Sequence, residues 1–273
     1  MAFHLRSNIV ADFARRNLGL TIARQNLALE RLTSGLRINR SADDPAGLAV
    51  SERLRTQVLG LHQAQRNSED AISLVQIAEG GLQQIDEIIQ RMRSLAIQAA
   101  NATLTSADRT LVQVEINQLI DEIDRQASST QFNTKKIFTQ NQSLTFHVGA
   151  NRTDTLTLQI SSVTAAGLGV DTVDVTGSSN VNALKAISQL DTALDRINTQ
   201  RANLGAFQNR LENVVNFIGI SSENMASALA KVREADIAEE IVNFTREQIL
   251  AQTGTALLAQ ANQTPATVLA LLT

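Results

Sequence analysis

The stretch ISQLDTALDRINTQRANLGAFQNRLENVVNFIGISSENMASALAKV, residues 187–232, carries an unbroken apolar repeat. Every seventh residue of it is apolar, and these heptad d positions are Leu190, Ile197, Leu204, Leu211, Ile218, Met225 and Val232. The a positions, from Ile187 to Leu229, are apolar with polar interruptions. Sustained a/d spacing of this kind is typical of a coiled-coil helix. At 1.5 Å per residue, this helix is expected to be about 70 Å long.

A second apolar seam lies upstream and supplies a partner for this helix. Its residues step by four and three: Ala71, Val75, Ala78, Leu82, Ile85, Ile89, Met92, Ala96 and Ala99. Asp44 and Pro45 form a common helix start signal, an N-cap followed by a first helical proline. A third helix is expected from Asp108 to Arg125, capped by Thr105 or by the next residue.

The apolar period then changes from 3.5 to 2, which indicates a β-hairpin. Residues 149–154 separate two alternating runs, which are Leu144, Phe146, Val148 and Leu156, Leu158, Ile160. Residues 161–183 are rich in Ser, Thr, Gly and Val. They are predicted to form a surface connection, or a minimal remnant of an inserted domain, rather than part of a core.

Both ends of the chain carry apolar stripes, and each stripe is predicted to be half of a helix pair. The first consists of Leu18, Ile22, Leu29, Leu32 and Leu36, and the second of Ile249 or Leu250, Leu257, Ala261, Val268 and Leu272. The predicted fold is mainly α: a long antiparallel coiled-coil helical bundle with a small β-hairpin region, and both termini forming an additional helix pair at one end. The predicted divisions are residues 1–43 and 234–273 for the terminal pair, with 44–182 and 183–233 for the bundle.

Composition argues against several classes of protein. Aromatic residues make up only 3%, with no Trp or Tyr, so aromatic-lined ligand pockets and base-stacking platforms are not expected. The net charge is −3 and the basic residues are scattered, which argues against nucleic-acid binding. There are no cysteines and no apolar run near the ~20 residues of a membrane span. The first residues lack the apolar region of a secretory signal, so any export is expected to use another route.

No catalytic or metal-binding motif emerges. The three histidines, His4, His62 and His147, lie far apart and form no HExxH or ExxH pair. Glycine-rich phosphate loops and the GxSxG elbow are absent from the sequence. An acidic metal pair at Asp43 and Asp44 is an alternative to the helix cap, which is the favoured interpretation. The sequence therefore predicts no enzyme, no cofactor and no metal.

Three stretches resemble bacterial flagellins. The first is Ser34-Gly-Leu-Arg-Ile-Asn39 with Asp43-Asp44 and Ala46-Gly47, the second Leu204-Gly-Ala-Phe-Gln-Asn-Arg-Leu211, and the third Leu258-Ala-Gln-Ala-Asn262 with Pro265, Val268-Leu269 and Leu271-Leu272. The resemblance covers about residues 1–160 and 185–273, and it implies a short member without outer inserted domains. A hook–filament junction protein shares the same logic at its termini and is the alternative.

The resemblance implies a structural subunit that polymerises into the flagellar filament, an extracellular homopolymer used for swimming. Its other implied partners are a flagellar export chaperone, the type III export apparatus, and the junction and cap proteins. Secretion without a cleaved signal peptide follows from the same route. The polymerisation interface is predicted at Leu18, Ile22, Leu29, Leu32, Leu36, Leu250, Leu257, Leu258, Val268, Leu269, Leu271 and Leu272.

A second surface follows from the resemblance alone. Flagellins sensed by the flagellin-specific Toll-like receptor use an arginine and a leucine on one central helix and a glutamate on the next. The matching residues are Arg91, Leu95 and Glu115. Arg91 and Leu95 are four residues apart and share one helix face.

Overall fold

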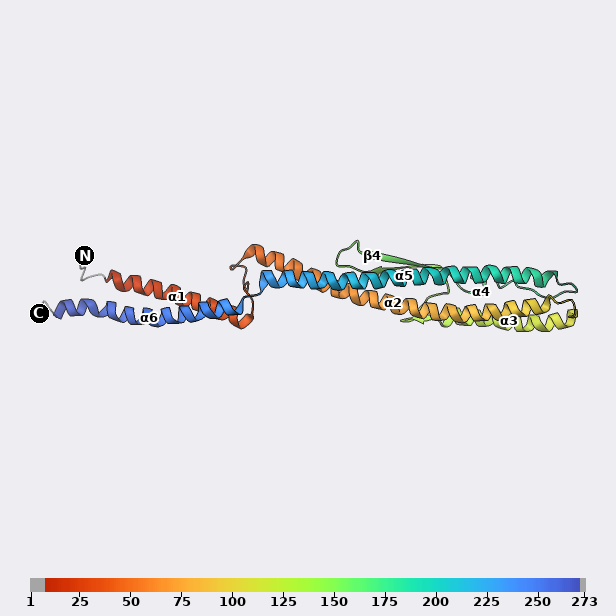
Figure 1. The fold of residues 1–273 in the computed structure, drawn as a ribbon, viewed down its shortest axis with the longest axis horizontal. Coiled ribbons are helices and arrows are strands. Elements are labelled where there is room, and N and C mark those ends of the chain that lie inside the picture. The colour runs from red at the N-terminus through yellow and green to blue at the C-terminus, as the bar shows by residue number, and fades with distance from the viewer. Residues whose placement is uncertain (1–7, 271–273) are drawn as a thin grey trace. The chain divides into compact units, whose positions relative to one another are not determined.

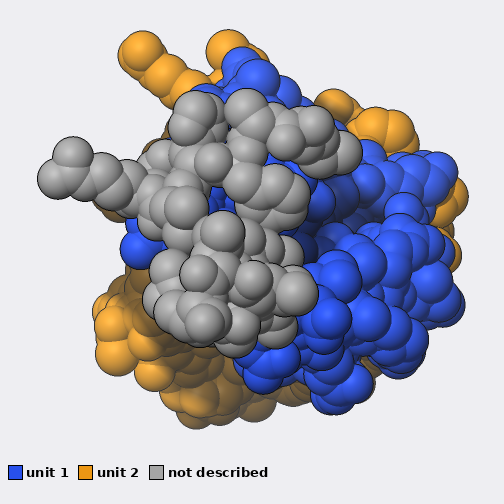
Figure 2. Space-filling view, turned by 90° about the vertical axis from the view of Figure 1, so that its left-hand side faces the viewer, with its two compact units in different colours: residues 1–57, 224–273 blue, residues 58–223 orange. Residues whose placement is uncertain are grey.

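The computed structural model describes residues 8–270, and side chains as far as residue 263. The chain forms two compact units: unit 1 contains residues 1–57 and 224–273, and unit 2 contains residues 58–223 (Figure 2). The described part is mainly α and carries two small antiparallel sheets (Figure 1). Its elements are α1 (Ile9–Ser34), α2 (Pro45–Ala99), α3 (Ser106–Ser129), β1 (Gln131–Phe132), β2 (Lys135–Lys136), β3 (Gln142–His147), β4 (Thr155–Ile160), α4 (Ala165–Leu168), α5 (Val181–Arg233) and α6 (Ile237–Ala270). Between residues 8 and 270, no helix combines the length and the apolar character needed to cross a membrane.

Helices α2 and α5 supply most of the core of unit 2. The predicted α2 stripe from Ala71 to Ala99 is buried throughout, and so are the α5 d positions from Leu190 to Ile218. The second buried row of α5 differs from the prediction. It lies one residue before the a positions, at Ala186, Ala193, Gln200 and Phe207.

This shift arises because α5 packs against the β-hairpin as well as against a helix. The Phe207 ring lies 5.9 Å from the ring of Phe146 on β3. Gln200 donates a hydrogen bond from Nε2 to the backbone oxygen of Gln159 on β4, at 3.3 Å. A heptad describes a helix with one partner, whereas this face of α5 has two.

Local signals set the starts of α2 and α3. The Thr105 side chain accepts from the Asp108 backbone N–H and the Asp108 carboxylate accepts from that of Thr105, so α3 begins with a capping box. The Asp44 carboxylate accepts the Gly47 N–H at 2.8 Å, and Pro45 is the first residue of α2. The predicted caps are therefore confirmed, and α3 runs four residues beyond its predicted end.

The hairpin forms where it was predicted. Strands β3 and β4 pair antiparallel, with Leu144 opposite Leu158 and Phe146 opposite Leu156. Leu144 and Leu158 are buried. The other face is polar and uncharged near its middle, where the hydroxyls of Thr145 and Thr157 lie 3.3 Å apart.

The prediction that residues 161–183 form only a surface connection was wrong. They contribute seven buried apolar side chains to the core of unit 2: Val163, Ala165, Leu168, Val170, Val173, Val175 and Ala183. Polar side chains of α3 hold this segment in place: the backbone N–H of Val175 donates to Gln113 Oε1, and that of Ala165 donates to Asp124 Oδ1, both at 2.8 Å. The segment is polar on average, but four of its five valines are buried, and only Val181, at the start of α5, is exposed.

Unit 1 contains the helix pair α1 and α6, which runs antiparallel. The two chain segments that lead into this helix pair are joined by backbone hydrogen bonds. The backbone N–H of Arg37 donates to the Arg233 oxygen at 2.7 Å, and that of Ala235 donates to the Gly35 oxygen at 3.0 Å. Gly35 has φ 70°, a left-handed conformation that glycine adopts readily at the end of a helix.

Candidate assembly surface

The contact between α1 and α6 is a heptad seam made mostly of small or polar residues. On α1 the covered positions are Ala11, Ala14, Leu18, Thr21, Gln25, Ala28 and Leu32, and on α6 they are Glu240, Phe244, Glu247, Ala251, Gly254, Leu258 and Ala261. Both series step by three and four residues, which is the coiled-coil spacing. Few large side chains fill this seam, so the pair buries little apolar surface of its own.

Three contacts define the register of the pair. Asn8 donates from Nδ2 to the Ala261 backbone oxygen at 2.8 Å, near one end. Arg31 and Glu240 form an ion pair at 2.9 Å, near the other. Between them, a Cβ on Gly254 would lie 3.1 Å from Cδ1 of Leu18, so glycine permits a close approach of the two helices here.

Large apolar side chains lie on the outside of this pair. Phe13 on α1 is 59% exposed, and Leu257 on α6 is 64% exposed. The other exposed members are Ile9, Val10, Leu20, Ile22, Leu29, Ile237, Ile241, Val242, Ile249 and Leu250. Four of the α6 residues line a groove of about 420 Å³ on that helix: Ile241, Val242, Ile249 and Leu250. Contiguous apolar surface of this kind marks a site of protein association.

The residues predicted for the polymerisation interface fall into three groups. Ile22, Leu29, Leu250 and Leu257 are exposed, whereas Leu18, Leu32, Leu36 and Leu258 are half-buried within unit 1. Val268 and Leu269 belong to α6, but their side chains lie outside the described residues, as do Leu271 and Leu272 entirely. Four exposed α1 residues were not predicted from the sequence, and these are Ile9, Val10, Phe13 and Leu20. Their apolar character is visible in the sequence, but which side of α1 faces outward depends on where α6 packs.

The three residues matched to receptor contacts lie in unit 2 but do not share one exposed patch. Arg91 on α2 and Glu115 on α3 are exposed and form an ion pair at 2.7 Å. Leu95 is only 4% exposed and belongs to the core of the unit. The predicted surface therefore reduces, in this structure, to the exposed pair.

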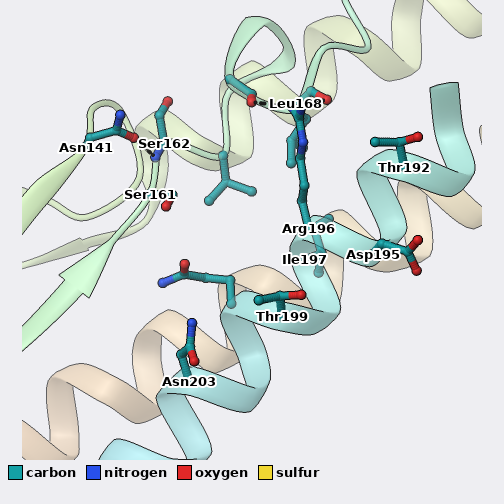
Figure 3. Close-up of a pocket in the computed structure, with 13 residues that line it drawn as sticks. Asn141, Ser161, Ser162, Leu168, Thr192, Asp195, Arg196, Ile197, Thr199 and Asn203 are labelled. Atoms are coloured by element: carbon teal, nitrogen blue, oxygen red, sulfur yellow. Dashed lines mark hydrogen bonds between the residues drawn. The ribbon is translucent and has the colours of Figure 1, made fainter.

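A groove of about 590 Å³ lies in unit 2 between α5 and the segment that follows β4 (Figure 3). Its two charged lining residues are Asp195 and Arg196. The Arg196 guanidinium donates to the backbone oxygens of Gly167 and Leu168 at 3.1 and 3.0 Å, so it fastens α4 to α5. Within residues 8–263, no cluster of three or more histidine, aspartate or glutamate side chains is arranged to hold a metal ion.

These features define a class of protein: a mainly helical chain with a well-packed unit and a terminal helix pair whose apolar side is uncovered. Comparison with known proteins identifies the family. Residues 5–143 match the bacterial flagellin N-terminal helical region, and residues 187–272 match the bacterial flagellin C-terminal helical region. The chain belongs to the bacterial flagellin family.

Individual relatives agree over nearly the full length. A flagellar filament 33 kDa core protein of Treponema phagedenis is 44% identical, covering 98% of this chain and 99% of the relative. A flagellin of Bacillus subtilis is 37% identical with the same coverage. Among solved structures, a Bacillus cereus flagellin is 32% identical and covers 60% of this chain and 94% of its own, with a TM-score of 0.47.

Proposed function

We propose that this chain is a structural subunit of the bacterial flagellar filament, without catalytic activity. The observation that carries the proposal is the uncovered apolar surface of α1 and α6. Fully burying one large apolar side chain contributes about 1.5–3 kcal/mol, so twelve of them left outside represent a large driving force for association. The relative from Treponema phagedenis is itself named a flagellar filament core protein.

A helical polymer of identical copies is the arrangement that covers such a surface on every subunit. The exposed apolar side chains of α1 and α6 meet those of neighbouring copies, and the half-buried leucines of the seam support them. The proposed inner domain is made of residues 1–43 and 234–273, and the bundle of 44–182 and 183–233. Unit 1 also takes in the first turns of α2 and the last turns of α5.

Electron microscopy of the purified protein tests this proposal. Helical tubular filaments of uniform diameter are the expected result. Deleting residues 264–273 is expected to abolish polymerisation while the helical content and thermal unfolding of unit 2 stay unchanged, because the deleted residues belong to unit 1. Filaments of the truncated chain that match the full-length ones would contradict the interface at Val268, Leu269, Leu271 and Leu272.

The export partners follow from the same surface. Before assembly, an exposed apolar helix pair favours aggregation, so a flagellar export chaperone is proposed to cover α6 in the cell. The subunit then leaves through the flagellar export apparatus without a cleaved signal peptide and meets the junction and cap proteins outside. Recovery of a one-to-one complex from cells lacking the hook, lost on deletion of residues 237–273, is the expected result; soluble chaperone-free protein would contradict it.

Recognition by the flagellin-sensing Toll-like receptor is proposed at Arg91 and Glu115, with Leu95 beneath them. Arg91→Ala is expected to lower receptor-dependent signalling by the unassembled chain, because it removes the exposed cation and frees Glu115. Arg125→Ala is the matched control, since this arginine on α3 also pairs with a glutamate but lies elsewhere. Equal signalling by both variants would contradict the assignment.

A further inference from the structure

One carboxylate in the α1·α6 seam has an oxygen that is shielded from solvent and has no hydrogen-bond donor among the described residues. Oε2 of Glu247 is buried and accepts no hydrogen bond, although the residue as a whole is only half-buried. An unsatisfied buried oxygen costs free energy, and a charged one costs more than a neutral one. A hydrogen-bond donor placed at this oxygen would remove that cost.

The heptad repeat indicates where that donor is. Arg31 pairs with Glu240, and their side chains are 26% and 10% exposed. Glu247 lies seven residues after Glu240 on α6, and Arg24 lies seven residues before Arg31 on α1. Because the helices are antiparallel, these steps lead to the same level of the seam.

Contacts on both sides show that the register holds at this level. Arg31 and Glu240 bond on one side of it, and Leu18 meets Gly254 on the other. Arg24 is exposed, and its guanidinium forms no ion pair or hydrogen bond within the described residues. Arg24 and Glu247 are therefore placed relative to each other as Arg31 and Glu240 are, one heptad further along the seam. The difference is that the Arg24 guanidinium and the Glu247 oxygen are unpaired in the described part of the chain.

We propose that Arg24 and Glu247 form a second ion pair within the same chain, closing when neighbouring copies cover the helix pair. Covering α1 removes water from Arg24, and the guanidinium then turns inward to the buried oxygen. The two Arg–Glu pairs, one heptad apart, fix the axial register of α1 against α6, which the small side chains of the seam specify weakly. This inference rests on the proposed filament, since assembly supplies the cover.

A double-mutant cycle in the filament tests the pair. Arg24→Gln and Glu247→Gln are each expected to raise the concentration of subunit in equilibrium with filament by about two- to tenfold, and the double variant by no more than the larger single effect. Arg16→Gln is the matched control, because Arg16 is also an exposed α1 arginine that forms no ion pair within the described residues, but it lies at a different heptad position. The effects of Arg16→Gln and Glu247→Gln on the concentration of free subunit are expected to add.

Crosslinking decides whether the pair lies within one chain. The natural sequence has no cysteine, so Arg24→Cys with Glu247→Cys introduces the only two thiols. A short bifunctional thiol reagent applied to filaments is expected to give crosslinked single chains, as Arg31→Cys with Glu240→Cys should. Crosslinks mainly between chains, or additive effects in the cycle, would overturn the inference while leaving the filament itself established. Failure of the unaltered chain to polymerise would instead contradict the proposed function.

Discussion

Units 1 and 2 use apolar side chains in opposite ways. Unit 2 buries large ones in a continuous core, with Leu82, Ile89, Met92 and Ile197 fully covered. In the described part of unit 1, the buried apolar residues are Ala28, Ile38 and Ala261, while its larger side chains lie mostly outside. Unit 2 therefore has a core of its own, whereas unit 1 leaves uncovered the apolar surface that we propose neighbouring copies bury.

The largest expected effect is on the unfolding of unit 2. Ile197→Ala is expected to lower the free energy of unfolding of the unassembled chain by about 2–5 kcal/mol, because it leaves a cavity in a close-packed core. Denaturant unfolding followed by circular dichroism measures it. Ile249→Ala, the same change at an exposed position of unit 1, should stay within about 0.5 kcal/mol. Equal losses of unfolding free energy on changing Ile197 and Ile249 would contradict the difference between the two units.

The same Ile249→Ala variant is expected to matter in the polymer. If a neighbouring copy covers Ile249, the shortened side chain should weaken each subunit contact by about 1.5–3 kcal/mol. The soluble concentration left after pelleting filaments reports this loss. Gln252→Ala, an exposed polar position on the same helix, serves as control and should leave that concentration unchanged.

A third variant addresses the close helix approach in the seam. Gly254→Val is expected to weaken filaments by about 1 kcal/mol, because its side chain meets Leu18 and Leu18 must move. Gly19→Val introduces the same group on α1, where a Cβ would have no neighbour within 4 Å. Comparable pelleting of the two valine variants would show that the close approach does not persist in the assembled state.

The smallest expected effect concerns acid. Hydrogen bonds from the backbone and side chain of Thr105 lower the pKa of Asp108, and bonds from the backbone N–H groups of Arg40 and Asn39 lower the pKa of Asp43. A lowered folded-state pKa gives stability that is present above the usual aspartate value of 3.8 and lost as pH falls through the folded pKa.

Asp108→Asn should therefore remove a small part of the acid dependence of unit 2 unfolding, seen as a flatter stability profile below pH 3.8. Asp43→Asn should leave that profile unaltered, since Asp43 belongs to unit 1. An unchanged slope for Asp108→Asn would indicate that the capping box does not persist in solution.

Sequence patterning predicted the features that depend on a single element or on one element and one partner. The α2 stripe, the α5 d positions, the hairpin and the Thr105 cap are of this kind. The g-position row at Ala186, Ala193, Gln200 and Phe207 was not predicted, because it requires the hairpin to pack against α5. The outward direction of Phe13 and Leu20 was missed for a related reason. Leu18 and Leu20 look alike in sequence, and only the position of α6 shows that Leu18 faces the seam whereas Leu20 faces outward.

The short passage between Val175 and Ala183 has a practical consequence. Both of these residues are buried, whereas Ser178 and Ser179 between them are exposed. The Arg109 guanidinium holds the Gly177 oxygen on one side, and α5 begins at Val181 on the other. A peptide spliced between the two serines would leave those anchors unchanged. Every subunit of the polymer would then display one copy, turning the chain into a scaffold that presents a graft at a fixed repeat distance.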